Sequence, residues 1–573
     1  MGKIYTADFE TTTDINDCRV WAYAICEVGN PDNFIYGNSI EDFMKILANN
    51  ESNDKYYFHN LKFDGEFIFS YILNQGFEYV PSKKERKSKS FSCIISDTGQ
   101  FYQIEIYFTV TKKHTNKVTI LDSLKLLNFS VDKIAKDFKL PINKLSIDYK
   151  AKREVGHILT PEEIAYIRND VEIMARALKI MFDEGLTKMT IGSNALSIYK
   201  EMNQRFDTYF PVLPAEVDKD IRRSYKGGFT YLNPLYKEKE VGYGNIYDVN
   251  SLYPSVMYYE DMPIGNPEFF KGEYQYDPLY PLYIVTLSCS FKLKKGKIPT
   301  IQLKRNLHYL PTEYIETTNG DIETFTLTNI DLELFLSHYD VEDLMYHSGW
   351  KFKSTKGLFC CYIDMYTNLK INSKKEGNGA LYLIAKLMLN SLYGKFGLNP
   401  EMRSKYPYLK EDGSIGYHLT DKELRDSVYI PVATFITSYA RRKTITTSQK
   451  IRDYSLKTYG EDYYIYSDTD SIHCRNLDAR ELMGIIEIDK YKLGAWDNEA
   501  QFIRGKYIRQ KCYIEHLQGK DKINVTIAGF PKNLGEKVTF DNFNPDFSSN
   551  GKLAFKHVKG GIVLVDTTFT IKR

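Results

Sequence analysis

The sequence lacks several features that would assign it to common protein classes. No apolar run approaches the ~18 residues that a membrane span needs, and the N-terminus has no hydrophobic secretory segment. The eight cysteines include no Cys-x-x-Cys pair, and the ten histidines show no zinc spacing. A P-loop of the form GxxxxGKS or GxxxxGKT is also absent. We therefore expect a reduced, cytoplasmic protein without a membrane segment.

The composition is that of a globular protein, with 43% hydrophobic and 26% charged residues. The length of 573 residues predicts roughly three or four domains at ~150 residues each. The net charge of +2 indicates little, but basic clusters at 83–89, 292–297, 441–443 and 504–511 have Tyr or Phe in or near several of them. A single cluster of this kind is typical of a solvated surface. The four together favour a groove in which cations meet phosphates and rings stack on bases.

The pattern of apolar residues changes along the chain. The first ~190 residues alternate β-like and helical runs, as in an α/β domain, and one helix is predicted to start at Thr160 with a capping box to Glu163. Residues 260–360 are rich in Tyr, Pro and short β-like runs and look inserted. Residues 361–397 are strongly helical, and 398–427 read as a turn-rich loop or hairpin.

Acidic residues occur in pairs two positions apart. Asp8 and Glu10 share this spacing with Asp468 and Asp470, and in a strand both members of such a pair point the same way. Paired carboxylates are unfavourable unless a cation neutralises them, and hard divalent ions prefer oxygen ligands. Two such ions activate an attacking oxygen and stabilise a leaving one in phosphoryl transfer. The apolar residues around Asp468 and Asp470 place this pair at a turn or cleft with a buried base.

Further acids extend each pair into a candidate metal site. In the first domain Asp64 and Asp170 join Asp8 and Glu10 as four carboxylates for two ions; Tyr166, four positions before Asp170, is predicted to orient a water molecule. Lys144 is predicted to offset charge near a phosphate. In the second region Asp248 joins Asp468 and Asp470, with the carbonyl of Val249 as a further ligand. We expect Asp468 to be the principal partner of Asp248, and Asp470 to act more through position.

A helix in the second region carries polar residues on one face. Lys386, Asn390 and Tyr393 follow at i, i+4 and i+7, with Leu and Met on the opposite side. Lys386 is predicted to bind a triphosphate, and Tyr393 is predicted to contact a base pair. An amphipathic helix whose polar face is exposed to solvent explains the same pattern. Tyr253 is predicted to stack under a sugar and exclude a 2′-hydroxyl. The alternative for Tyr253 is a core residue before Pro254.

Eight short motifs resemble those of the family B DNA polymerases. "DFE", "NLKFD" and "YIRND" are similar to the three exonuclease motifs, and "DVNSLYPS", "KLMLNSLYG" and "YSDTDS" to polymerase motifs A, B and C. "YKGG" (225–228) resembles the linker motif YxGG, and "KCY" (511–513) the KxY motif. The full set follows in order over essentially the whole chain. The chain therefore resembles the protein-primed bacteriophage DNA polymerases of the phi-twenty-nine group.

The resemblance implies an α/β multidomain enzyme, in which an RNase-H-like 3′–5′ exonuclease domain precedes a right hand of palm, fingers and thumb with two terminal-protein-region insertions. The implied boundaries are 1–190 for the exonuclease, 191–259 and 428–527 for the palm, 260–360 for the insertion that contacts the priming protein, 361–397 for the fingers, 398–427 for the second insertion and 528–573 for the thumb. The second insertion would enclose the template and give strand displacement and processivity.

The resemblance also implies ligands and partners. These are two Mg²⁺ ions per active site (with Mn²⁺ as an alternative), dNTPs, a DNA template and primer, and a terminal protein that forms a heterodimer with the polymerase at initiation in the cytoplasm of an infected bacterium. The residues implied to hold single-stranded DNA in the nuclease are Thr11, His59, Asn60, Phe63, Ser123 and Leu124. Those implied to contact template or primer are Tyr225, Gly227, Gly228, Lys511 and Tyr513.

The sequence departs from the family pattern at two places. The segment before motif B, "KINSKKEGNGALY", is longer than usual, so the second phosphate-binding lysine is Lys374 or Lys370, and we favour Lys374. Two residues after Lys144 the family often has an acid, whereas this chain has Ser146.

Two other classes of protein have to be weighed against a polymerase. One is a nuclease whose second half only binds DNA, and the other is a structural replication-initiation protein. The first leaves Asp248, Asp468 and the face of Lys386 unexplained, and the second explains neither carboxylate group.

Overall fold

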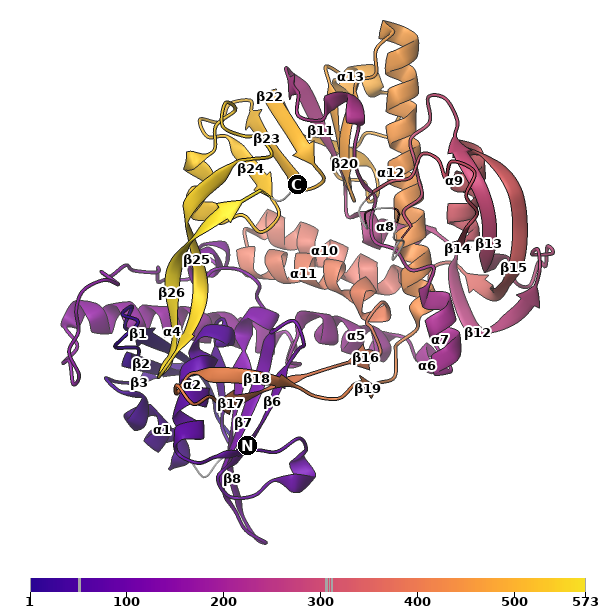
Figure 1. The fold of residues 1–573 in the computed structure, drawn as a ribbon. Helices are drawn as coiled ribbons and strands as arrows, with labels where there is room; N and C mark the ends of the chain where they lie inside the picture. Colours follow the sequence, from indigo (N-terminus) through magenta and orange to yellow (C-terminus); the bar gives the residue numbers. More distant parts are fainter. Residues whose placement is uncertain (1, 50–52, 304–307, 309, 311–312, 572–573) are drawn as a thin grey trace.

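The computed structural model describes residues 2–49, 53–303, 308, 310 and 313–571. An N-terminal α/β domain, a central sheet with helices beside it and an inserted β sheet form the main bodies (Figure 1). Helices α10 and α11 lie between the N-terminal domain and the central sheet in this view. Among the described residues, no helix is both long and apolar enough to cross a membrane.

The N-terminal domain is built on one mixed sheet of eight strands in the order β3-β2-β1-β4-β8-β7-β6-β5. The strands are β1 (Ile4–Thr11), β2 (Val20–Glu27), β3 (Asn30–Gly37), β4 (Lys55–Phe58), β5 (Glu78–Tyr79), β6 (Ser90–Ile95), β7 (Phe101–Val110) and β8 (Thr115–Asp122). β1, β4 and β8 pair in parallel, and the remaining pairs except β5–β6 are antiparallel. This confirms the α/β domain predicted from the alternating pattern.

Helices cover this sheet and supply the other acidic residues of the domain. They are α1 (Ile40–Ala48), α2 (Leu61–Asn74), α3 (Val131–Asp137) and α4 (Pro161–Asp183). α4 begins at the predicted position, because Thr160 accepts a hydrogen bond from the backbone N–H of Glu163 and the Glu163 carboxylate accepts one from the N–H of Thr160. The start of α4 matters because it fixes Tyr166 and Asp170 one turn apart on the face toward β1.

The central sheet runs in the order β24-β23-β22-β11-β21-β20-β9, with β10 paired to β22. Its strands are β9 (Thr230–Leu232), β10 (Glu240–Val241), β11 (Gly244–Val249), β20 (Tyr464–Asp468), β21 (Ser471–Arg475), β22 (Trp496–Arg509), β23 (Cys512–Leu517) and β24 (Asn524–Ile527). Segments more than two hundred residues apart therefore meet in one sheet. The helices of this half are α5 (Ile191–Met202), α6 (Phe206–Tyr209), α7 (Ala215–Arg222), α8 (Leu252–Tyr259), α12 (Ile430–Tyr459) and α13 (Ala479–Leu482).

The 30-residue helix α12 has no counterpart in the sequence-based expectations for residues 428–527. Its middle contains a run of Thr and Ile, residues of weak helix propensity. The helix exists because nineteen of its residues are buried on several sides, against α8, α9 and the central sheet. It ends at Gly460, which has a φ of 71°.

The described residues of the range 260–360 form a four-stranded sheet in the order β12-β15-β13-β14, with α9 beside it. The elements are β12 (Met262–Lys271), β13 (Leu282–Leu293), β14 (Glu323–Thr328), α9 (Asn329–His338) and β15 (Tyr339–Thr355). Residues 361–397 are helical as predicted, in α10 (Cys360–Glu376) and α11 (Gly379–Phe396). The break falls at Gly377, whose φ of 71° ends α10.

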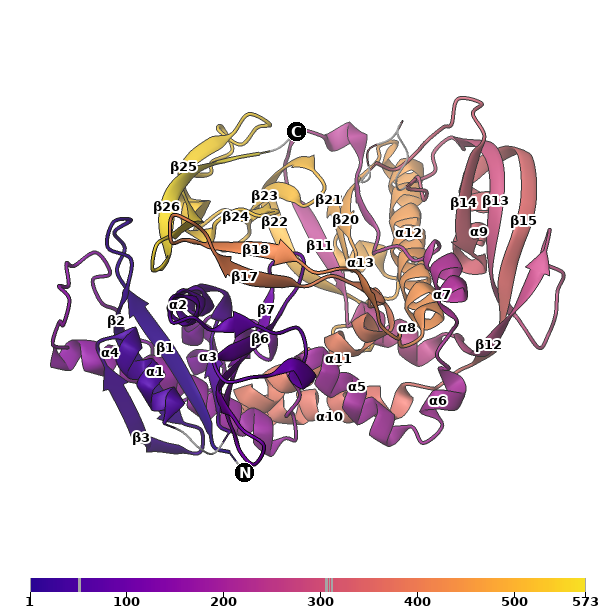
Figure 2. The same ribbon diagram turned by 60° about the horizontal axis from the view of Figure 1, so that its bottom comes forward.

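Two long hairpins reach from the second half of the chain to the N-terminal domain. Residues 398–427 contain β16 (Glu401–Met402), β17 (Lys405–Leu409), β18 (Ile415–Leu419) and β19 (Glu423–Leu424), which confirms the predicted hairpin. The C-terminal hairpin is β25 (Ser548–Val558) with β26 (Gly561–Thr570). Figures 1 and 2 show both hairpins ending beside α2.

Candidate active sites

Four carboxylates from three elements meet in the N-terminal domain. Asp8 and Glu10 lie on β1, Asp64 on α2 and Asp170 on α4, as the sequence predicted. Carboxylate oxygens of Asp8, Glu10 and Asp170 all lie within 4.8 Å of one another. Asp64 is 3% exposed and accepts a hydrogen bond from the backbone N–H of Phe9 at 3.3 Å. These residues line a cavity of about 390 Å³.

The charges in this cluster are poorly compensated. Burial, reinforced by the nearby Asp170, raises the pKa of Asp8 to about 7. Burial and the neighbouring carboxylates also hold the pKa values of Glu10 and Asp64 well above their ordinary range. Acidic groups gathered in this way suit hard divalent cations, which would favour the charged form of each.

Lys144 and two tyrosines border the same cavity. Lys144 forms an ion pair with Asp170 and lies over the ring of Tyr166 at 5.2 Å. Burial opposes the charge on Lys144, but Asp170 outweighs it and the pKa of the ammonium is raised. The Tyr166 hydroxyl lies 2.7 Å from that of Tyr149. The sequence reasoning missed Tyr149, because it lies in an irregular segment without any periodic pattern.

The residues expected to hold single-stranded DNA lie around this cavity or beside it. His59, Asn60 and Phe63 line it, and Thr11 ends β1. Asn60 has a φ of 78°, and its backbone N–H donates to Asp122 Oδ1, as does that of Leu124. Ser123 is 1% exposed and donates to the carbonyl of Phe58, so its hydroxyl holds His59 in place at 3.0 Å.

A second acidic group lies on the central sheet. Asp248 is in β11, next to the hairpin that β20 and β21 form. The expected position of Asp468 and Asp470 at a turn is confirmed, because β20 ends at Asp468 and Asp470 lies in the turn after Thr469, whose φ is 58°. The backbone N–H of Val249 donates to the carbonyl of Asp470 at 2.8 Å and so ties this turn to β11.

Burial has the largest effect on Asp248, and Asp470 is the strongest of the neighbouring charges. Together they raise the pKa of Asp248 to about 8, with Glu499 and Asp497 adding to the effect and Lys386 opposing it. Burial, and then the Asp468 charge, also raise the pKa of Asp470. The charge of Asp470 therefore acts on Asp248, while the order of Asp468 and Asp470 as partners of Asp248 stays a prediction.

The carboxylate of Asp468 already has partners. Lys511 Nζ lies 2.8 and 2.9 Å from its two oxygens, and Thr230 Oγ1 donates to it at 3.2 Å. The ring of Tyr513 packs on that of Tyr466 with centroids 5.1 Å apart, and the Tyr466 hydroxyl accepts from the backbone N–H of Lys511 at 3.0 Å. The "KCY" motif is thus placed directly beside motif C.

Two acids near Asp248 escaped the sequence reasoning. Asp497 and Glu499 lie on β22, the strand that pairs with β11 on the side away from β21. Their spacing of two positions is the same signal that singled out Asp8 with Glu10. Their place beside Asp248 depends on a strand pairing that the sequence does not reveal.

A lysine cluster lies on α10 and α11. Burial lowers the pKa of Lys370, and the charges of Lys386 and Lys374 lower it further, so these three side chains lie close together. Lys370 therefore lies within range of the charges of both Lys386 and Lys374, and the choice between Lys370 and Lys374 stays open. A cavity of about 520 Å³ is lined by Lys386 and Asn390 together with lysines of α3.

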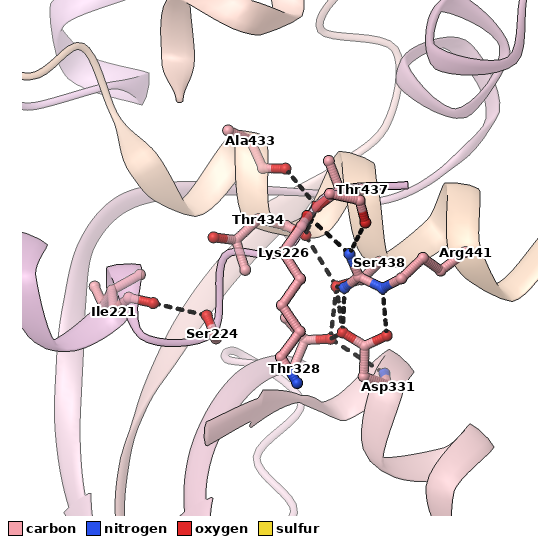
Figure 3. Close-up of polar contacts among 11 residues, drawn as sticks. Ile221, Ser224, Lys226, Thr328, Asp331, Ala433, Thr434, Thr437, Ser438 and Arg441 are labelled. Carbon is pink, nitrogen blue, oxygen red and sulfur yellow. Dashed lines mark hydrogen bonds and ion pairs between the residues drawn. The ribbon is translucent and has the colours of Figure 1, made fainter. Parts of the chain in front are cut away.

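The "YKGG" segment contacts both motif C and the buried core. A Cβ added to Gly228 would lie 2.6 Å from Thr469 Oγ1, so only glycine permits this approach. The guanidinium of Arg441 on α12 donates to the carbonyls of Lys226 and Gly227 at 2.9 and 2.8 Å. The same guanidinium pairs with Asp331 on α9, and both side chains are buried (Figure 3).

The central sheet, its paired acids and the adjacent lysine-bearing helix define a DNA-polymerising enzyme. The chain belongs to the family of DNA polymerases of type B, organellar and viral, whose family model matches residues 47–160 and 151–486. It is a phage DNA polymerase of the phi29 type. This confirms the expected family, fold class and activity, and it excludes the two alternatives of a nuclease with a DNA-binding platform and a structural initiation protein.

Curated relatives and solved structures match over the full length. The chain is 46% identical to the DNA polymerase of Bacillus phage B103, with 100% of each covered, and 44% identical to that of Bacillus phage phi29, with 100% of this chain and 99% of the relative covered. It is similar to the structure of phi29 DNA polymerase complexed with primer-template DNA and incoming nucleotide substrates, with a TM-score of 0.93, 44% identity and full coverage of both chains.

Proposed function

We propose that the chain is a proofreading, protein-primed replicative polymerase that synthesises DNA at Asp248, Asp468 and Asp470 and degrades it at Asp8, Glu10, Asp64 and Asp170. The observation that carries this proposal is the separation of the two carboxylate clusters, one on the N-terminal sheet and one on the central sheet. A second apolar core fills the N-terminal sheet, although the larger core of the central sheet also extends to α4. Two independent chemistries can therefore coexist on one chain.

The donor sets fit divalent cations, and Mg²⁺ is the ion we propose, two per site, with Mn²⁺ as a substitute. The ligands are the seven carboxylates of the two clusters and the carbonyl of Val249. When bound, such ions lower the pKa of an attacking hydroxyl or water and neutralise the charge that develops on the phosphate. The raised pKa values of Asp8 and Asp248 support this assignment, because these groups lack a cation that matches their charge.

In synthesis, the 3′-hydroxyl oxygen of a primer forms a bond to the α-phosphorus of a dNTP, pyrophosphate leaves, and the hydroxyl loses its proton. Lys386, with Lys374 as the more exposed of its two neighbours, is proposed to bind the triphosphate. Asn390 and Tyr393 face the new base pair, and Tyr253 excludes a 2′-hydroxyl. Tyr225, Gly227, Gly228, Lys511 and Tyr513 are proposed to hold template and primer.

In degradation, a water oxygen forms a bond to the phosphorus of the 3′-terminal nucleotide and loses its proton. The bond from that phosphorus to the 3′-oxygen of the preceding nucleotide breaks, and the terminal nucleotide is released as a monophosphate. Tyr166 is proposed to orient the water and Lys144 to bind the phosphate, while the residues around His59 hold the single strand. Frayed 3′ ends are the preferred substrate, because a mismatched end costs less to unpair.

The proposed domain boundaries are those that the resemblance implies. Residues 1–190 form the exonuclease, 191–259 and 428–527 the palm, 361–397 the fingers and 528–573 the thumb. The insertion at 260–360 is proposed to bind a terminal protein that supplies the priming hydroxyl, in the cytoplasm of the infected host. The hairpin at 398–427 is proposed to enclose the template and give strand displacement.

Extension of a 5′-labelled primer with Mg²⁺ and dNTPs tests the two-site proposal. Asp8→Ala combined with Glu10→Ala is expected to abolish shortening of the primer and to leave extension within about twofold, since the acids lie outside the central sheet. Asp248→Asn is expected to abolish extension and leave shortening intact. A single substitution that removed both activities would show that the sites are not independent.

Priming is tested by incubating the enzyme with a labelled dNTP and a candidate terminal protein. Transfer of label to that protein, resistant to denaturation, is the expected result, because a protein hydroxyl then replaces the primer 3′-hydroxyl. Extension of DNA primers without any labelling of the protein would contradict protein priming.

A further inference from the structure

A buried carboxylate on α2 joins three parts of the chain that are far apart in sequence. Glu66 is 3% exposed. Its Oε1 accepts a hydrogen bond from the Tyr417 hydroxyl of β18 at 2.7 Å and lies 3.1 Å from Nε2 of His557 on β25. Tyr417 and His557 belong to the two hairpins that reach the N-terminal domain. One oxygen atom therefore contacts both hairpins at once.

Each hairpin also has a contact of its own with the N-terminal domain. The ring of Tyr406 on β17 stacks on that of Tyr79, with centroids 4.4 Å apart and an angle of 6° between the planes. In the C-terminal hairpin, a Cβ added to Gly560 would lie 2.1 Å from the carbonyl oxygen of Cys18. The Tyr79–Tyr406 stack and the Gly560 approach each fix one hairpin, whereas Glu66 is shared.

In this arrangement, with both hairpins in contact with Glu66, only one of its two carboxylate oxygens accepts hydrogen bonds from described residues. Its second carboxylate oxygen, Oε2, is buried, and no described residue donates a hydrogen bond to it. A buried acceptor without a partner is destabilising, and for a charged group more so, because water would solvate it after separation. When the hairpins are docked, Glu66 therefore gains two polar contacts at Oε1 and loses the hydration of Oε2. This balance suits a contact that opens and closes.

We propose that Glu66 is a positioning residue that latches the 398–427 hairpin and the C-terminal hairpin onto α2, so that DNA lying between the two halves of the enzyme is retained during synthesis. This inference rests on the proposed function of the 398–427 hairpin in enclosing the template. Glu66 does not touch the reacting atoms. It acts through Tyr417 and His557, and its loss weakens the attachment of both hairpins at once.

The test compares synthesis per binding event with single-nucleotide addition. Primed single-stranded circles are extended in the presence of excess unlabelled DNA as a trap, and one-nucleotide incorporation is measured on a short primer-template. Glu66→Ala is expected to shorten the product made per binding event about tenfold, the size that loss of a hydrogen bond to a charged group gives. The kcat and KM of one-nucleotide incorporation should stay within about twofold, which general misfolding would not allow.

Matched variants separate the latch from a local packing defect. Glu66→Gln keeps an oxygen acceptor and is expected to recover part of the product length. His557→Gln on its own should shorten products, and adding it to Glu66→Ala should cause no further loss, because both act through the same contact. Tyr406→Ala and Gly560→Ala each loosen one hairpin, so each should shorten products less than Glu66→Ala does.

The outcomes are decisive in both directions. If Glu66→Ala makes full-length products per binding event, the latch is wrong. It is equally wrong if single-nucleotide addition and product length fall together, or if the effects of Glu66→Ala and His557→Gln add. If the unmodified enzyme itself releases DNA after a few nucleotides and cannot displace a strand, the proposed role of the hairpin fails instead, which is a distinguishable result.

Discussion

The ring of Tyr253 is stacked on the ring of Tyr393, with centroids 4.1 Å apart and an angle of 27° between the planes. Tyr253 lies at the start of α8, five residues after Asp248, and Tyr393 near the end of α11. The contact joins the acid-bearing sheet to the lysine-bearing helix. Tyr253 packs against the main apolar core but is only half-buried, so part of its ring stays accessible to the proposed nucleotide site.

Shortening Tyr253 is expected to relax selection against ribonucleotides. Tyr253→Val removes the ring that would meet a 2′-hydroxyl, and discrimination should fall by about tenfold or more, in the range for steric selection in a pocket. The measurement is the ratio of kcat/KM for a dNTP and the matching rNTP in single-nucleotide incorporation. Tyr393→Phe is the control, because it keeps the stacked ring. An unchanged ratio in Tyr253→Val would contradict the gate.

The ion pair between Lys511 and Asp468 gives a second prediction. Lys511 is more than half exposed and holds both oxygens of Asp468, so a primer phosphate competes for the same ammonium. Lys511→Ala is expected to weaken primer binding about tenfold, the size expected for a charged contact. The effect should appear in the Kd for primer-template at low salt and shrink as salt rises. Lys511→Arg should retain most of the affinity, and equal loss in both variants would rule out a charge effect.

Local patterns in the sequence predicted the elements that depend on neighbours in the chain. The capping box placed the start of α4, and the two-position spacing of Asp8 and Glu10 placed both on one face of a strand. The turn at Asp470 was one of two interpretations, because the positive φ of Thr469 has no sequence signal of its own. Threonine rarely adopts a positive φ, so the hairpin around Thr469, and not the preference of the residue itself, imposes this conformation.

Features that depend on distant contacts were not predictable in the same way. α12 is helical through burial rather than propensity, and Asp497 and Glu499 reach Asp248 only because β22 pairs with β11. The ion pair between Asp468 and Lys511 was hidden for a related reason, since Lys511 lies in the turn between β22 and β23, more than forty residues further along the chain. Glu66 gave no signal at all, because its two partners lie 351 and 491 residues away.

The raised pKa of Asp248 predicts how stability depends on pH without metal. Its carboxyl titrates near 3.8 when unfolded and at about 8 when folded, so the folded state binds the extra proton between these values. Stability should therefore fall as pH rises from about 4 to 8. In EDTA, the Tm of the unmodified protein should drop more between pH 6 and pH 8 than that of Asp248→Asn, which cannot ionise.

Added Mg²⁺ or Mn²⁺ should reduce this drop in the unmodified protein, because a bound cation favours the ionised carboxylates. The comparison with Asp248→Asn removes the pH effects of all other groups. Equal drops in the two proteins in EDTA would show that Asp248 does not carry the effect.

The buried pair of Arg441 and Asp331 predicts a coupling between stability and the two activities. Burial alone would raise the pKa of Asp331, but the Arg441 guanidinium outweighs it and the pKa is lowered, so the pair is ionised. Asp331→Ala leaves a buried guanidinium without its partner and is expected to cost about 3–5 kcal/mol. The neighbouring Arg442 pairs with Glu260, and both side chains are partly exposed, so Arg442→Met is the control and should cost less than about 1 kcal/mol.

The same substitution should change the balance of degradation and synthesis. Arg441 holds the carbonyls of Lys226 and Gly227, in the segment between the N-terminal domain and the central sheet. Asp331→Ala frees the guanidinium to move, so the primer end should be held less firmly beside Asp470 and degraded more often. The measurement is the dNTP concentration at which extension overtakes degradation on one labelled primer-template, which should rise several-fold. If thermal stability falls while this concentration stays the same, Arg441 stabilises the fold without positioning the linker.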